Sequence, residues 1–130
     1  MIVVDASVIV TALADDGPDG DQARERLRGE RLAAPHLIDL EVISAWRRMA
    51  SAGDLAGRRA ELAIADLRAL RVDRVSHGRL LERCWELRAN LTIYDGAYVA
   101  LAEILDAVLL TADNRLARAP GMRCTIELLA

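Results

Sequence analysis

The chain has 130 residues, 53% of them apolar, and carries a net charge of −3. This length predicts one domain over residues 1–130 with a hydrophobic core, and the apolar content excludes wholesale disorder. No apolar run reaches the about 20 residues that cross a bilayer, and the first residues lack a signal-peptide pattern. The isolated Cys84 and Cys124 fit a reducing compartment, so we expect a cytoplasmic protein with no membrane partner.

All 17 basic residues are arginines, and lysine is absent. Guanidinium groups suit bidentate contacts with phosphate, so the acidic net charge does not exclude a nucleic-acid partner. A GC-rich coding bias would produce the same composition. The arginines therefore permit phosphate binding without demonstrating it.

The N-terminal stretch predicts a buried strand that ends in an acid. Ile2-Val3-Val4 is an unbroken β-branched run, and Asp5 follows directly. A buried carboxylate needs a partner, a proton or a metal ion, because a bare buried charge is too costly. Residues 6–14 predict a short helix, 15–21 a solvated turn that caps the next helix, and 22–28 that helix.

The middle of the chain predicts a helical hairpin. Residues 32–34 are a short strand candidate, and 37–52 and 55–70 show helical periodicity. Glu41 lies at the margin of the apolar face of the first helix, where it either serves a site or pairs with Arg48. Three leucines of the second helix are expected to turn inward: Leu62, Leu67 and Leu70.

The C-terminal half alternates helix and strand again. The pattern predicts a strand at 71–75, helices at 77–89 and 92–105, a buried strand at 107–111, a short helix at 114–119 and an edge strand at 124–128. Thr92 with Asp95 fits a capping box, and Asp113 can cap the short helix. This alternation predicts an α/β fold with a mainly parallel sheet of four to five strands, flanked by helices.

Acidic residues gather where the predicted elements begin or end. If the strands that precede Asp5 and Asp113 are parallel neighbours, both acids lie at the carboxyl edge of the sheet, where ligands bind in such folds. Four carboxylates are candidates for one site there: Asp5, Glu41, Asp95 and Asp113. Such a cluster suits Mg²⁺ or Mn²⁺, which can activate water against a phosphodiester.

Other phosphate chemistries fit less well. The chain has no phosphate-binding loop of the Gly-x-x-x-x-Gly-Lys type and no Gly-x-Ser-x-Gly nucleophile elbow. Receiver domains and haloacid-dehalogenase-type phosphatases use a lysine at their acidic sites. The dehalogenase pattern also needs Asp-x-Asp, whereas Ala6-Ser7 follows Asp5 here.

Four stretches carry a family resemblance: Val3–Ser7, Pro35–Glu41 with the following Ala45–Arg48, Tyr94–Ala102 and Leu110–Leu116. Their order and spacing resemble the PIN domain, specifically VapC-type toxins of bacterial toxin–antitoxin pairs. The resemblance implies an α/β/α sandwich and a Mg²⁺- or Mn²⁺-dependent endoribonuclease that acts on RNA. It further implies a homodimer held by a cognate antitoxin, with the family's acids at Asp5, Glu41, Asp95 and Asp113. Gly96 departs from the alanine that is usual after the third acid.

The resemblance also suggests supporting residues. Three of them would hold the acids in place: Ser7, Thr111 and Asn114. Three arginines are candidate contacts to the RNA backbone: Arg47, Arg48 and Arg115. Two other functions stay open from the sequence, namely a catalytically silent module that binds RNA or protein, and a metal-dependent DNase.

Overall fold

The computed structural model describes residues 1–129 and contains a five-stranded sheet in which every strand pair is parallel. Its strand order is β3-β2-β1-β4-β5. The strands are β1 (Ile2–Val4), β2 (Leu32–Pro35), β3 (Val72–Val75), β4 (Val108–Thr111) and β5 (Ile126–Leu128). The predicted parallel sheet is confirmed, with β1 at its centre and β5 at one edge.

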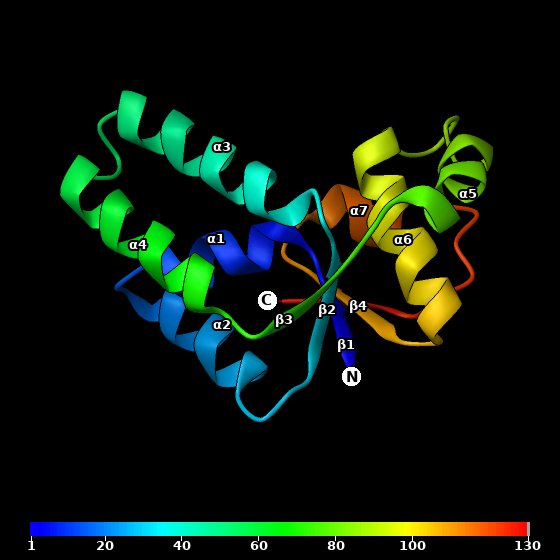
Figure 1. The fold of residues 1–130 in the computed structure, drawn as a ribbon, viewed down its shortest axis with the longest axis horizontal. Helices are drawn as coiled ribbons and strands as arrows, with labels where there is room; N and C mark the ends of the chain where they lie inside the picture. The colour runs from blue at the N-terminus through cyan, green and yellow to red at the C-terminus, as the bar shows by residue number, and fades with distance from the viewer. Residues whose placement is uncertain (130) are drawn as a thin grey trace.

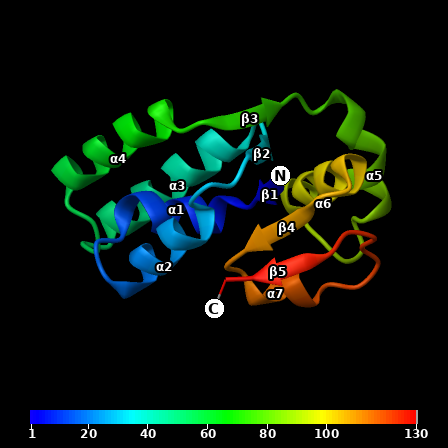
Figure 2. The ribbon, with the colours of Figure 1, turned by 90° about the horizontal axis from the view of Figure 1, so that it is seen from below.

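Helices cover both faces of the sheet (Figures 1 and 2). The helices α1 (Ala6–Ala14), α2 (Pro18–Leu27), α3 (Ile38–Ser51) and α4 (Gly57–Ala69) form one layer. The other layer contains α5 (Leu81–Glu86), preceded by the short 3-10 helix η1 (Gly78–Leu80), and α6 (Ile93–Leu105). A short helix, α7 (Asn114–Arg118), packs beside β4 and β5.

The core is densest where β1 meets α6. All three residues of β1 are buried, as a central parallel strand requires. In α6, seven consecutive residues from Gly96 to Ala102 are buried, because this helix contacts the sheet on one side and α5 on the other. A Cβ on Gly96 would lie 3.3 Å from Cys84 Cα, so the glycine permits close packing of the two helices.

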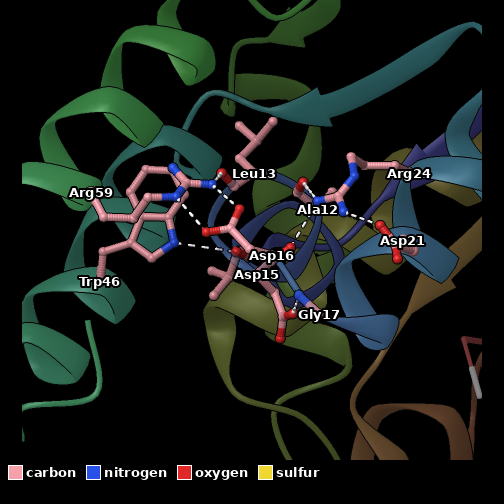
Figure 3. A network of polar contacts seen from close by, with 10 residues as sticks. Ala12, Leu13, Asp15, Asp16, Gly17, Asp21, Arg24, Trp46 and Arg59 are labelled. Carbon is pink, nitrogen blue, oxygen red and sulfur yellow. Dashed lines mark hydrogen bonds and ion pairs between the residues drawn. The ribbon is translucent and has the colours of Figure 1, made fainter. Parts of the chain in front are cut away.

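The acidic stretch at residues 15–21 differs from its prediction as a solvated turn, because α2 already begins at Pro18 (Figure 3). Proline fits the first position of a helix. The negative charges of Asp19 and Asp21 in the first turn interact favourably with the positive end of the helix dipole. Arg24 donates to the carbonyls of Ala12 and Asp15 over 2.9 and 2.8 Å. The loop is thus held by hydrogen bonds rather than solvated throughout.

The prediction that Leu62, Leu67 and Leu70 turn inward is partly wrong. Leu67 is buried and Leu70 is half-buried, but Leu62 is 60% exposed, because α4 packs mainly on α1 and α3 at the outer edge of its layer. The helix predicted at 77–89 ends at Glu86, and Trp85 on it is 62% exposed. No helix within residues 1–129 is long and apolar enough to span a membrane.

Candidate active site at the carboxyl edge of the sheet

The first site residue, Asp5, lies where the order of the strands reverses. Strand β1 pairs with β2 on one side and with β4 on the other, which makes the crevice outside β1 and β4 the expected ligand position. The backbone N–H of Asp5 donates to the Leu110 carbonyl over 2.9 Å. Asp113 follows β4 by two residues, so the two acids occupy the same edge, as the sequence predicted.

Two helices bring further carboxylates to this edge. Asp95 lies in the first turn of α6, whose N-cap Thr92 accepts a hydrogen bond from the Asp95 N–H. Glu41 lies in the first turn of α3. The negative charges of Asp5 and Asp95 act on Glu41, and those of Asp5 and Asp113 act on Asp95. We call these four side chains the acidic cluster: Asp5, Glu41, Asp95 and Asp113.

Hydroxyl groups fix the carboxylate of Asp5, which is only 6% exposed. Ser7 Oγ and Thr111 Oγ1 both donate to its Oδ2, over 2.6 and 2.9 Å. The same hydroxyl oxygens accept from the backbone, Ser7 from the Ala112 N–H and Thr111 from the Asp113 N–H, each over 3.0 Å. Asp5 and the start of the Asp113 loop are therefore held by one continuous network.

Glu41 has a partner that the sequence analysis missed. Tyr98 Oη donates to Glu41 Oε1 over 2.6 Å, and Tyr98 is fully buried in α6. Glu41 does not form the ion pair with Arg48 that we considered from the sequence. Tyr98 lies three residues after Asp95 and therefore on the same helix face, but this spacing does not distinguish a hydrogen-bond donor from a core residue.

Burial and mutual repulsion perturb the protonation of two carboxyls. Loss of solvent raises the pKa of Glu41, and the charges of Asp5 and Asp95 raise it further, although the hydrogen bond from Tyr98 opposes them. Burial likewise raises the pKa of Asp95, with contributions from Asp5 and Asp113 that outweigh the Thr92 hydrogen bond. Both carboxyls therefore hold their protons more tightly than carboxyls in water.

The other candidates lie around this cluster. Asp113 Oδ1 accepts from the Arg115 N–H over 2.8 Å, which caps α7, and the Arg115 side chain is 92% exposed. Asn114 is exposed and makes no side-chain hydrogen bond within residues 1–129. Arg47 and Arg48 are exposed on α3, with Arg48 Nη1 donating to Ser44 Oγ over 3.1 Å.

The carboxylates of the acidic cluster are candidate ligands for a metal ion. Within residues 1–129, no three His, Cys, Asp or Glu side chains converge closely enough to enclose one. The chemistry of the acidic cluster nevertheless fits Mg²⁺, which prefers carboxylate oxygens, retains several waters and is satisfied by one or two protein carboxylates. Repulsion among the four acids gives a cation a further reason to bind there.

Comparison with known proteins agrees with this geometry. Ribonuclease VapC9 of Mycobacterium tuberculosis is 45% identical over 129 residues, covering 99% of this chain and 98% of its own. A toxin–antitoxin complex from Klebsiella pneumoniae has the same fold, with a TM-score of 0.67 at 15% identity and coverage of 100% and 98%. VapBC2 from Rickettsia felis, solved bound to a promoter DNA fragment, gives 0.71 at 15% identity and full coverage of both chains.

These likenesses confirm the predicted α/β/α sandwich. A family model described as PIN domain matches residues 2–122. Together with the identity to VapC9 across nearly the whole chain, this match shows that the chain belongs to the PIN domain family and, within it, to the VapC ribonucleases.

Proposed function

We propose that the chain is an endoribonuclease toxin, and that the acidic cluster cleaves RNA phosphodiester bonds with Mg²⁺ or Mn²⁺. The observation that carries the proposal is the meeting of four carboxylates at the strand-order reversal, with Asp5 fixed by two hydroxyl groups. Membership of the VapC ribonucleases supports the same activity.

Three acids of the cluster would hold the metal ion, one or two of them directly and the others through water: Asp5, Asp95 and Asp113. When bound, the ion lowers the pKa of a water molecule and neutralises charge on the phosphate. The Ser7 and Thr111 hydroxyls occupy Asp5 Oδ2, which leaves Oδ1 free of protein donors within residues 1–129.

Glu41 would not hold the metal ion but would act as the general base that accepts a proton from the attacking water. Burial and the charges of Asp5 and Asp95 raise its pKa, which makes the Glu41 carboxylate a stronger base than an ordinary glutamate. Tyr98 orients the carboxylate through Oε1 and leaves Oε2 to position and deprotonate the attacking water. Three exposed arginines would contact the RNA backbone: Arg47, Arg48 and Arg115.

The same proposal includes the partners of the protein. We expect a cognate antitoxin, because a toxin–antitoxin complex shares the fold, and a homodimer, because that is usual in the family. A cytoplasmic location agrees with an RNA substrate and with the free thiols of Cys84 and Cys124.

The test uses the purified chain, freed of any antitoxin, incubated with total RNA and Mg²⁺ or Mn²⁺. We expect discrete cleavage that EDTA abolishes, and no cleavage of DNA assayed in parallel. Asp5→Asn should abolish cleavage and remain folded, because asparagine keeps one acceptor oxygen for the Ser7 and Thr111 hydroxyls. The matched control is Asp54→Asn, an exposed aspartate outside the cluster, which should cleave as the wild type does.

Two results would contradict the proposal. Undiminished cleavage by a folded Asp5→Asn protein would exclude the acidic cluster as the site. Cleavage that persists in EDTA would exclude the metal ion.

A further inference from the structure

A pocket of about 410 Å³ opens beside the acidic cluster, and the mechanism above assigns no ligand to it. Glu41 lines it, so the pocket is continuous with the proposed site of cleavage. The remaining wall residues are Leu37, Leu40, Ser44, Arg48 and Tyr94. This volume is in the range of sites that bind small organic groups, about 300–1,000 Å³.

One wall of the pocket is a face of α3. Glu41, Ser44 and Arg48 recur at spacings of three and four residues, so they follow one another along the same side of the helix. Seven residues separate Glu41 from Arg48, which corresponds to about 10 Å along the helix axis. The carboxylate of Glu41 and the guanidinium of Arg48 therefore start from positions about two helical turns apart on the same wall of the pocket.

The opposite wall is Tyr94, directly before Asp95 at the start of α6. Its side chain is 64% exposed, and its hydroxyl makes no hydrogen bond within residues 1–129. Tyr94 and Leu37 also line a smaller apolar cavity of about 120 Å³, so part of the Tyr94 side chain has apolar surroundings. An accessible aromatic ring of this kind is the feature on which single-stranded nucleic acids stack their bases.

Arg48 supplies a positive charge, which the phosphate next to a stacked base would need. It forms no ion pair with a carboxylate within residues 1–129, and its guanidinium is held against the pocket by Ser44 Oγ, 3.1 Å away. By contrast, Arg24, Arg59 and Arg83 all pair with acids. Besides the Glu41 carboxylate, the pocket thus combines an aromatic ring, aliphatic side chains and a guanidinium that pairs with no acid within residues 1–129, which suits a flat base joined to a phosphate better than a purely apolar ligand.

We propose that this pocket binds one nucleobase of single-stranded RNA next to the cleaved phosphodiester, with Tyr94 stacking on the base and Arg48 binding a backbone phosphate. The proposal rests on the proposed ribonuclease function and extends it to the choice of cleavage site. Stacking on Tyr94 accepts every base and gives a modest preference through differences in stacking strength, whereas the phosphate contact of Arg48 strengthens binding without regard to sequence.

The first experiment maps cleavage of a random-sequence RNA pool by sequencing. We expect the wild type to prefer particular bases at one position beside the cut. Tyr94→Ala should lower kcat/KM by about tenfold and flatten that preference, whereas Tyr94→Phe should retain both. Trp85→Ala is the matched control, because Trp85 is 62% exposed but lies on α5 outside the pocket, and it should behave as the wild type.

The second experiment measures binding without cleavage. In the Asp5→Asn background, Tyr94→Ala should weaken binding of a labelled single-stranded RNA of mixed sequence by about tenfold. Arg48→Ala should weaken binding equally for all sequences and reduce the slope of log affinity against log salt by about one. Its base preference should stay unchanged.

The outcomes separate this inference from the proposed function. If Tyr94→Ala cleaves and binds RNA as Trp85→Ala does, the proposed base subsite is wrong, and the pocket would instead bind a protein segment. If RNA binding depends on Tyr94 but the wild type cleaves nothing in Mg²⁺ or Mn²⁺, the subsite stands and the catalytic function fails.

Discussion

The hydroxyl of Tyr98 donates a 2.6 Å hydrogen bond to Glu41 Oε1, and this bond joins α6 to α3 across the carboxyl ends of the strands. The two helices belong to opposite layers of the sandwich (Figure 2). A single side-chain contact therefore orients one member of the acidic cluster and ties the two layers together at the site.

Tyr98→Phe should weaken both the fold and the site. The substitution removes only the hydroxyl, and a hydrogen bond to a charged group contributes about 1.5–3 kcal/mol. Because the bond from Tyr98 lowers the pKa of Glu41, its loss should raise that pKa further. The acid limb of the cleavage rate against pH should then move to higher pH, while urea unfolding shows the lost stability.

Tyr94→Phe is the control for this prediction. The Tyr94 hydroxyl has no hydrogen-bond partner within residues 1–129, so its removal should change neither unfolding nor the pH profile. An acid limb that moves equally in both variants would show that the Tyr98–Glu41 bond does not control the titration.

The positions of Asp5 and Asp113 could be predicted because they depend on chain order alone. Each acid follows an apolar β-branched or leucine-rich run, and parallel strands end at one edge. The partner of Glu41 could not be predicted in this way. Tyr98 lies in a helix that is apolar on every side, so its sequence neighbours indicate a core residue and not a hydrogen-bond donor.

Packing between helices was harder to predict than the sheet. The run at residues 15–21 has turn-forming residues, but its composition does not reveal the contacts from Arg24 to Asp15 and from Arg59 to Asp16 that hold the loop (Figure 3). Leu62 follows the apolar period of its helix but remains 60% exposed. Periodicity identifies an apolar stripe without specifying how far the neighbouring elements extend over it.

Thr111→Val should test the hydroxyl support of Asp5 without altering any carboxylate of the acidic cluster. Valine keeps the shape of threonine but loses the hydroxyl that donates to Asp5 Oδ2 and accepts from the Asp113 N–H. We expect a stability loss of about 1–3 kcal/mol, because a buried donor and acceptor lose their partner. The kcat for RNA cleavage should fall as well. Thr125→Val, on an exposed threonine, should leave both quantities unchanged.

Gly20→Ala should destabilise the junction of α1 and α2. A Cβ on Gly20 would collide with the backbone carbonyl of Asp15, and that carbonyl is held by Arg24. Forcing such a contact costs about 1–3 kcal/mol, measured as a lower urea midpoint. At Gly57, also in a helix, an added Cβ meets nothing within 4 Å, so Gly57→Ala should be neutral or slightly stabilising. Equal midpoints for the two variants would contradict the prediction.

The acidic cluster should make the metal-free protein less stable as pH rises. Burial, followed by neighbouring negative charges, raises the pKa values of Glu41 and Asp95 above those of the unfolded chain. A carboxyl with a raised folded-state pKa binds its proton more tightly in the folded state, so it stabilises the fold at low pH. This contribution is lost as pH rises from the ordinary carboxyl range, about pH 4, through the raised pKa values.

The double variant Glu41→Gln/Asp95→Asn should remove this dependence, because neither side chain titrates. We expect it to gain stability relative to the wild type as pH increases, with the largest difference at neutral pH, measured by urea unfolding in EDTA. Added Mg²⁺ or Mn²⁺ should raise the Tm of the wild type, since a cation that binds only the folded state stabilises it by mass action. The same addition should affect the double variant much less. A variant that is less stable than the wild type at neutral pH would show that these two carboxylates do not repel their neighbours. An equal response to the cation would show that Asp95 does not bind the ion.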